Sequence, residues 1–186
     1  MVWRHSGGRL NHCRPRINPE QPTGTYPCSG EHCQQIHQPV LDGRGLILAS
    51  NQIGYSLLNR RPESSGVLQA CRELDVSVIS FGPLFEGLLT GKYGNDTHPP
   101  LLVRLHWASK RLGSLDSLRS LMKDIASGHS ASQSQVALNW LISKGTLPIP
   151  GVKSEKQAAD NAATMRWELN GDKVEALDTA TARYLR

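Results

Sequence analysis

The amino-acid sequence predicts an α/β fold in which helices flank parallel strands. From about residue 46 onward, short apolar runs rich in β-branched residues alternate with longer segments of helical period. Strands alternating with helices favour parallel pairing, because each connection must carry the chain back across the sheet. About three strands can be counted, whereas a closed barrel of this class has eight. We therefore expect an incomplete parallel sheet.

The first part of this pattern contains two of the strands. Residues 29–42 (SGEHCQQIHQPVLD) are predicted as a helix with a serine cap, kinked late by Pro39. Residues 46–51 (LILASN) form an apolar run that suits a buried strand, and residues 62–74 follow as a helix. Residues 76–81 (VSVISF) are the second strand. The alternation thus reads strand, helix, strand, followed by a loop with several glycines.

The second part adds one strand and the remaining helices. Residues 117–127 and 132–143 have helical periodicity, and residues 146–149 suit a short strand. Two further helices are predicted over residues 154–165 and 172–184. Ser154 and Gln157 have the spacing of a capping box at the start of the first of these.

Residues 1–28 differ in character from the rest of the chain. They contain four prolines and three glycines and show no hydrophobic periodicity that could supply a core. Their arginines only loosely resemble those of a transit peptide, a class that is rich in serine and amphipathic. We predict a disordered, unrelated segment over residues 1–28 and one folded unit over residues 29–186.

Composition narrows the function classes. The net charge is +5, but the Lys and Arg residues are scattered with few aromatic residues among them, so a nucleic-acid partner is not expected. No apolar run approaches the length of a membrane span, and we expect a soluble intracellular protein of the cytoplasm or a plastid. The four cysteines are too few for a disulfide-stabilised secreted scaffold, so we predict that they are reduced thiols. Cys28, Cys33 and His37 are too loosely spaced for a typical zinc site, and no metal is predicted.

Two blocks carry a resemblance to a known family. Residues 48–93 contain NQIGYSLL and GPLFEGLLTGKY, and residues 134–163 contain ALNWL and IPGVKSEKQAADN. In this order the motifs resemble the second half of the barrel of the aldo-keto reductases, from about residue 29 to the C-terminus. The resemblance implies a partial (β/α)8 TIM-type barrel that binds NADP (as NADPH) across the carboxyl ends of its strands. It also implies reduction of small aldehydes and ketones by hydride transfer.

The resemblance assigns the nicotinamide end of the cofactor to two residues. Gln52 matches the residue that hydrogen-bonds the carboxamide, for which a side-chain amide offers both a donor and an acceptor. Phe81 matches an aromatic residue that stacks on the nicotinamide. Without the resemblance, Gln52 would be a polar residue at the end of a strand, and Phe81 would be a core residue.

The phosphate and adenosine contacts are implied in the same way. Pro83, Leu84 and Gly87 match a loop that wraps the pyrophosphate, although Gly82 replaces the usual serine and Glu86 is unfavourable near phosphate. Lys153 could meet the 2′-phosphate and favour NADP over NAD, or could be an ordinary surface lysine. A helix N-terminus would attract the phosphate beside it. The remaining implied cofactor contacts are Lys92, Gly151, Gln157, Asp160 and Asn161.

No catalytic residue is predicted in this chain. The family's Tyr acid, with its Lys, Asp and His, belongs to the first half of the barrel, and no Asp here has a Tyr five positions on. Tyr55 and Tyr93 belong to second-half motifs, and His37 lies on the predicted first helix. The first five strands are expected to be missing. The Ser-Asn pair that helps hold the carboxamide has no counterpart, because Tyr26 and Pro27 stand near its place.

Two functions remain open. The first is an NADP-dependent oxidoreductase of the aldo-keto reductase type, truncated, with weakened cofactor binding and little or no activity alone. The second is a non-catalytic module, built on a partial barrel, that senses a nucleotide or binds another protein. Self-association through the open edges of the sheet is a possible consequence of either.

Overall fold

The structure is a computed structural model that describes residues 27–29, 49–93 and 115–185. For residues 27–29 the backbone alone is described. Most of the predicted disordered segment, residues 30–42 of the predicted first helix and the loop over residues 94–114 lie outside the described residues.

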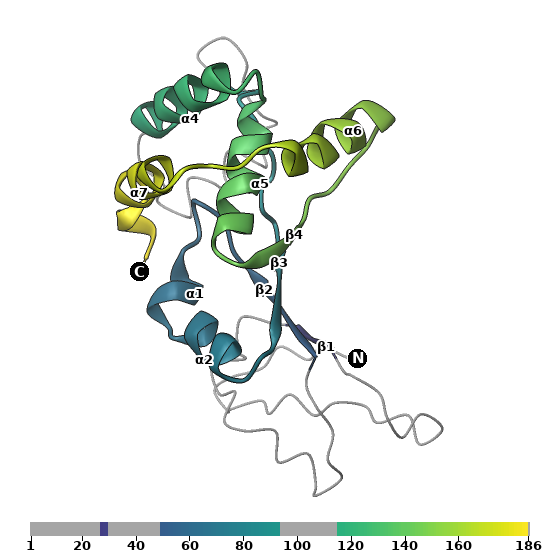
Figure 1. Ribbon diagram of the computed structural model, residues 1–186, viewed down its shortest axis with the longest axis vertical. Coiled ribbons are helices and arrows are strands. Elements are labelled where there is room, and N and C mark those ends of the chain that lie inside the picture. Colours follow the sequence, from purple (N-terminus) through teal and green to yellow (C-terminus); the bar gives the residue numbers. More distant parts are fainter. Residues whose placement is uncertain (1–26, 30–48, 94–114, 186) are drawn as a thin grey trace, which may run out of the picture.

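The described strands form one parallel sheet in chain order (Figure 1). The strands are β1 (Pro27–Ser29), β2 (Ser50–Gly54), β3 (Ser77–Phe81) and β4 (Thr146–Ile149). Every neighbouring pair is parallel. The predicted class, an α/β fold with a partial parallel barrel, is confirmed.

The structure adds one strand to the roughly three that were predicted. The described residues form a sheet of four strands, because residues 27–29 pair with residues 50–52 of β2. Pro27 and Cys28 were predicted to be disordered, and Ser29 was predicted to cap a helix. A three-residue strand that begins with proline has no detectable period, so only its pairing with β2 defines it. The described residues thus supply four of the eight strands of a closed barrel.

The helix predicted over residues 62–74 is divided in two. α1 (Arg61–Ser64) has Ser65 as its C-cap, and α2 (Val67–Glu73) begins after Gly66, whose φ is 78°. This left-handed conformation is accessible to glycine without a steric penalty and interrupts the helix. α2 buries Val67, Leu68 and Cys71, the apolar face that the predicted periodicity requires.

The predicted helices of the second part are all present. They are α4 (Asp116–Gly128), α5 (Gln133–Ser143), α6 (Glu155–Ala163) and α7 (Gly171–Ala180), with short 3-10 turns η1 (Thr164–Arg166) and η2 (Ala182–Tyr184). Ser132, Ser154 and Asn170 cap the last three helices by accepting a hydrogen bond from a backbone amide. In Figure 1, α4 and α7 lie on one side of α5, whereas α6 extends away on the other.

The core lies on the helix-covered face of the sheet. Asn51 and Ile53 of β2 and Val78 and Ser80 of β3 are buried on this face. α5 contributes fully buried residues, including Trp140, that pack against the strands and the neighbouring helices. Thr146 and Pro148 of β4 are in register with Val78 and Ser80 and lie on the same face. Because side chains alternate along a strand, the remaining residues of β2 to β4 point to the opposite face, the interior of the barrel.

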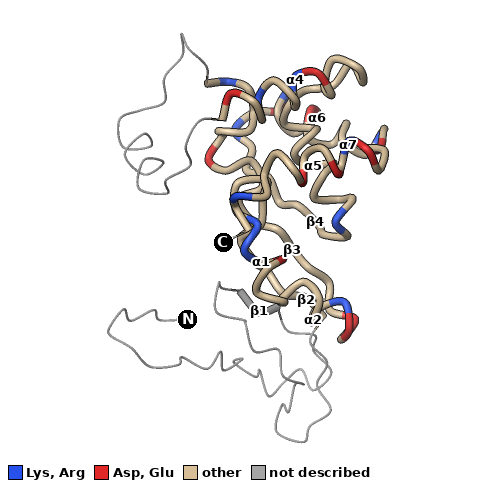
Figure 2. Tube along the Cα trace, turned by 90° about the vertical axis from the view of Figure 1, so that its left-hand side faces the viewer, with Lys and Arg blue, Asp and Glu red and all other residues tan. Residues whose placement is uncertain are grey.

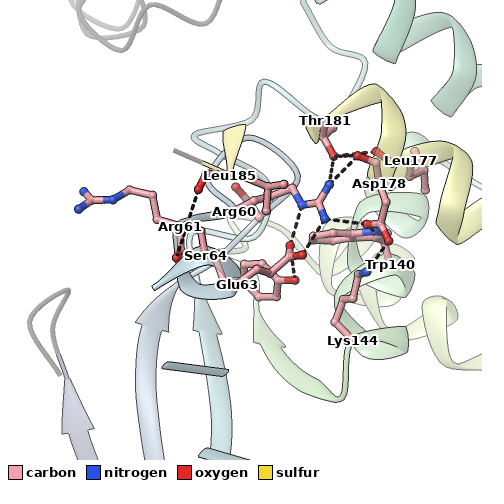
Figure 3. A network of polar contacts seen from close by, with 12 residues as sticks. Arg60, Arg61, Glu63, Ser64, Trp140, Lys144, Leu177, Asp178, Thr181 and Leu185 are labelled. Carbon is pink, nitrogen blue, oxygen red and sulfur yellow. Dashed lines mark hydrogen bonds and ion pairs between the residues drawn. The ribbon is translucent and has the colours of Figure 1, made fainter. Parts of the chain in front are cut away.

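A buried polar network fastens the C-terminal helix to the loop before α1 (Figure 3). The guanidinium of Arg60 donates two hydrogen bonds of 2.6 Å to the carboxylate of Glu63. The same group contacts the Asp178 carboxylate at 3.2 Å and donates to the Asp178 carbonyl and to Thr181 Oγ1. Lys144 Nζ lies 2.5 Å from the second Asp178 oxygen. The network therefore joins residues that are more than 100 positions apart.

Candidate cofactor-binding site

The carboxyl ends of three strands coincide. The parallel register places Gly54 of β2 beside Phe81 of β3, and Phe81 beside Ile149 of β4. The preceding inward-facing row contains Gln52, Ile79 and Leu147. Gln52 and Phe81, both predicted to contact the nicotinamide, thus lie on neighbouring strands and on the same inner face. Carboxyl ends of parallel strands are where α/β barrels place their ligands.

Phe81 lies against Gly54, which was not among the predicted site residues. A Cβ atom added to Gly54 would lie 3.1 Å from Phe81 Cζ, closer than ordinary van der Waals contact. The absence of a side chain at Gly54 therefore lets the ring lie across the end of β2. Phe81 remains 37% exposed on the inner face. A glycine inside a strand was the signal available in the sequence, since it often marks a close approach.

The loop after β3 is a series of tight turns anchored by leucines. Gly82, Gly87 and Gly91 all have positive φ, and Leu88 and Leu89 are buried beneath them. Phe85 and Glu86 also have positive φ, 46° and 55°, which is uncommon for residues with side chains. The loop therefore turns tightly and is held from below by the two buried leucines.

The predicted contacts of this loop are placed differently from one another. Pro83 is buried, and Leu84 is half-buried and packs against the core. Gly87 is half-buried and would admit a Cβ only at 3.6 Å from Tyr93. Lys92 is exposed, with its ammonium 5.3 Å from the centre of the Tyr93 ring. Lys92 thus borders open surface and Gly87 is partly covered by Tyr93, whereas Pro83 and Leu84 support the loop from inside.

The N-terminus of α6 forms the third part of the candidate site. Gly151 and Lys153 precede it and are exposed, and nothing lies within 4 Å of a Cβ built on Gly151. Ser154 Oγ accepts a hydrogen bond from the amide of Gln157. Gln157 Oε1 accepts one of 2.7 Å from the amide of Lys153, one residue before the amide that a capping box would use. The helix end is ordered, and its side chains leave the approach to Gly151 open.

Asp160 has partners within the protein. Its carboxylate accepts hydrogen bonds from Ser132 Oγ at 2.8 Å and from Gln135 Nε2 at 2.7 Å. Both donors belong to the start of α5, so Asp160 ties α6 to α5. Asn161, the next residue, is half-buried. A cofactor contact by Asp160 stays a prediction, and the structure adds a second role, that of positioning α6.

Tyr55 is not placed to act as an acid toward a substrate. Its side chain is buried, lies 5.2 Å from the Trp140 ring and donates a hydrogen bond of 2.9 Å to Glu63 Oε1. Burial, reinforced by the charge of Glu63, raises the pKa of the Tyr55 phenol well above its ordinary value. These contacts give Tyr55 a role in joining the segment before α1 to α5.

Because the pKa of Tyr55 is raised in the folded state, the free energy of unfolding is expected to decrease at alkaline pH. The folded state holds the proton more tightly than the unfolded state, whose phenol releases it near the ordinary value of 10.0. Stability from this group is therefore constant below about pH 9 and falls as pH rises above about 10. Urea unfolding of the wild type and of Tyr55→Phe, below about pH 9 and again above about pH 10, measures the loss of unfolding free energy in each protein. A smaller alkaline loss is expected in Tyr55→Phe, and equal losses would contradict it.

Among the described residues, the remaining thiol and metal-ligating side chains form no further candidate site. Cys71 is a buried free thiol near the Asn51 amide, and burial raises its pKa. Within residues 49–93 and 115–185, no three His, Cys, Asp or Glu residues are grouped to hold a metal ion. The side chains of Cys28, Cys33 and His37 lie outside the described residues. Among the described helices, none has the length and apolar character that crossing a membrane requires.

A partial (β/α)8 barrel with candidate ligand contacts at its carboxyl ends suits a dinucleotide-binding oxidoreductase. Residues 28–182 match the model of the Aldo/keto reductase family. The chain therefore belongs to the aldo/keto reductase family, a family of oxidoreductases, and the resemblance seen in the sequence is confirmed.

Individual relatives agree with this assignment. The chain is 38% identical over 150 residues to the chloroplastic pyridoxal reductase of Arabidopsis thaliana, covering 78% of this chain and 40% of the relative. It is 32% identical over 143 residues to the aldo-keto reductase yakc [NADP(+)] of Schizosaccharomyces pombe, covering 70% and 42%. The chain spans about two fifths of the length of these curated relatives.

Solved structures support the fold. A glycerol dehydrogenase from Gluconobacter oxydans superposes with a TM-score of 0.59 at 24% identity, over 74% of this chain and 43% of that one. A thermostable aldo-keto reductase superposes with a TM-score of 0.56 at 19% identity, over 73% and 41%. At these identities the similarity concerns the fold alone.

Proposed function

We propose that this chain is the dinucleotide-holding part of an NADP-dependent aldo-keto reductase, with little or no activity alone. The observation that carries the proposal is the common carboxyl edge at which Gln52, Phe81 and the loop after β3 meet. When bound, NADPH supplies the hydride for reducing a small aldehyde or ketone. Gln52 would hold the carboxamide, and the Phe81 ring would cover one face of the nicotinamide.

The phosphates would be held by the two other parts of the site. In the loop after β3, Lys92 is exposed and Gly87 is half-buried. The N-terminus of α6 offers backbone amides and the positive end of a helix dipole, beside the exposed ammonium of Lys153. The name of the yeast relative includes NADP(+), which supports the same cofactor. Roles for Pro83, Leu84, Gly151, Gln157, Asp160 and Asn161 remain part of this proposal.

The groups that protonate the carbonyl would come from outside residues 29–186. Tyr55 is buried and bound to Glu63, so it cannot deliver its proton to a ligand on the inner face. We also propose that cofactor binding is weakened, because the nicotinamide carboxamide would lack the Ser-Asn pair that helps hold it in the family. A plastid or cytoplasmic location and the absence of a nucleic-acid partner also remain proposals, the former supported by the chloroplastic plant relative.

Lys153→Met tests the cofactor assignment. Removing the ammonium beside the 2′-phosphate is expected to weaken NADPH binding about tenfold and to leave NADH binding unchanged. Isothermal titration of both nucleotides measures this without any turnover. Lys123→Met, which removes an exposed lysine of α4, is the matched control and should bind both nucleotides as the wild type does. Equal loss of NADPH and NADH affinity in Lys153→Met would contradict the assignment.

The alternative is a non-catalytic module that senses a nucleotide or binds another protein. It is favoured by the buried state of Tyr55 and by the exposed inner face of the sheet. Coexpression with the first half of a relative's barrel separates the two functions. NADPH-dependent aldehyde reduction by the pair supports the reductase, whereas nucleotide binding by the pair without turnover supports the module.

A further inference from the structure

Among the described residues, the inner face of the sheet is uncharged and open, and toward the ends of β3 and β4 it is apolar, whereas β2 contributes Ser50 and Gln52 to it. Phe81, Leu147 and Ile149 point to this face and are 37%, 61% and 43% exposed, respectively. Ile79, half-buried, pairs with Leu147 across β3 and β4. In closed barrels this face is filled by layers of side chains, and parallel sheets usually have both faces covered. The part of the face formed by the ends of β3 and β4 therefore has the composition of a core without its second half.

The two edge strands of the sheet, β1 and β4, run in the same direction and each has an unpaired side among the described strands. β1 pairs only with β2 and β4 only with β3 among the described strands, so one side of each is open. All four strands run in the same direction. A twofold rotation about an axis along the barrel preserves strand direction and brings β4 of one copy beside β1 of the other. Four strands from each of two copies give eight, the number that closes this class of barrel.

The charge distribution favours a second copy over a charged partner. The chain carries a net charge of +5, yet β2, β3 and β4 contain no charged residue. Figure 2 shows these strands free of blue and red, with both charge types interspersed on the helices. Two copies could therefore meet through their inner faces without burying like charges, whereas a charged partner would find no ion-pair partner on these strands.

We propose that two copies of this chain close one eight-stranded parallel barrel. The inner faces form a shared core, and β4 of each copy pairs with β1 of the other. Both candidate cofactor sites then lie at the same end of the barrel. This association goes beyond the proposed function, and it does not require that a nucleotide bind.

Leu147→Glu and Met165→Glu test the proposal as a matched pair. Both residues are exposed and apolar, but Met165 is 76% exposed on η1, away from the inner face. In sedimentation equilibrium the wild type and Met165→Glu are expected to be dimers. Leu147→Glu would place a charge in the shared core and should raise the dimer dissociation constant by at least about tenfold.

Further readouts keep the test decisive. Circular dichroism of Leu147→Glu should retain the helical signal, since Leu147 lies outside the helix-covered core. Hydrogen exchange at β4 should slow with rising protein concentration in the wild type and not in Leu147→Glu, because the open edge becomes paired. A monomeric wild type, oligomers that grow beyond two copies, or a Leu147→Glu dimer of unchanged affinity would each overturn the proposal.

Discussion

Replacing Arg60 with methionine is expected to lower the free energy of unfolding by about 3 kcal/mol. The Arg60 side chain is 5% exposed and is shared by the carboxylates of Glu63 and Asp178. Methionine keeps much of the packing volume but removes every donor. Two partly buried carboxylates would then remain close to each other with less compensation, and the α7 carbonyl of Asp178 would lose its shortest hydrogen bond, the one from Arg60.

Arg61→Met is the control for this measurement. Arg61 is exposed, and Figure 3 shows its side chain directed away from the network around Arg60. Its replacement is expected to change stability by no more than about 0.5 kcal/mol. Urea unfolding at one fixed protein concentration compares the two variants, because self-association would shift apparent stability. Equal effects of the two replacements would show that the network does not hold α7 in place.

Replacing Trp140 with alanine is expected to cost about 4 kcal/mol. The Trp140 side chain is fully buried, packs against Tyr55 and donates from Nε1 to Asp178 Oδ1 at 3.0 Å. The guanidinium of Arg60 and the ammonium of Lys144 lie 5.5 Å and 5.3 Å from its ring. Alanine would leave a cavity between α5 and the loop after β2 and remove an aromatic surface from both cations.

Trp140→Phe separates packing from hydrogen bonding. Phenylalanine keeps a ring in contact with Tyr55 and loses the indole donor, while Asp178 keeps Arg60 and Lys144. A loss of about 1 to 2 kcal/mol is therefore expected by the same urea unfolding measurement. A phenylalanine variant as unstable as the alanine variant would mean that the hydrogen bond to Asp178, and not the buried ring, dominates.

Elements with a clear period could be predicted from the sequence. β3, β4, α4 and α5 were found within one or two residues of their predicted ends, because burial imposes a period on each. β1 was missed because three residues carry no period. The break at Gly66 was missed because the apolar positions that define the helical period, Val67, Leu68 and Cys71, all lie in α2 and do not indicate where the helix begins.

The sequence predicts candidate residues for the site but not their contacts. Motif order predicts Gln52, Phe81 and Gly151 as site residues, and the parallel register places the first two on neighbouring strands and on one face. The approach of Phe81 to Gly54, and the bonds of Asp160 to α5, depend on segments that meet only in the folded chain. Likewise, nothing near Arg60 in the sequence indicates Asp178, which lies 118 positions away.

Hydrogen exchange with and without NADPH tests the central claim most directly. If the carboxyl ends of the sheet hold the dinucleotide, saturating NADPH should slow exchange in residues 52–55, 81–93 and 151–161. Exchange in α4 and α7, which lie on the far side of α5, should not change. Protection confined to these two helices, or no change anywhere at saturating nucleotide, would contradict the claim that this edge of the sheet is a cofactor site.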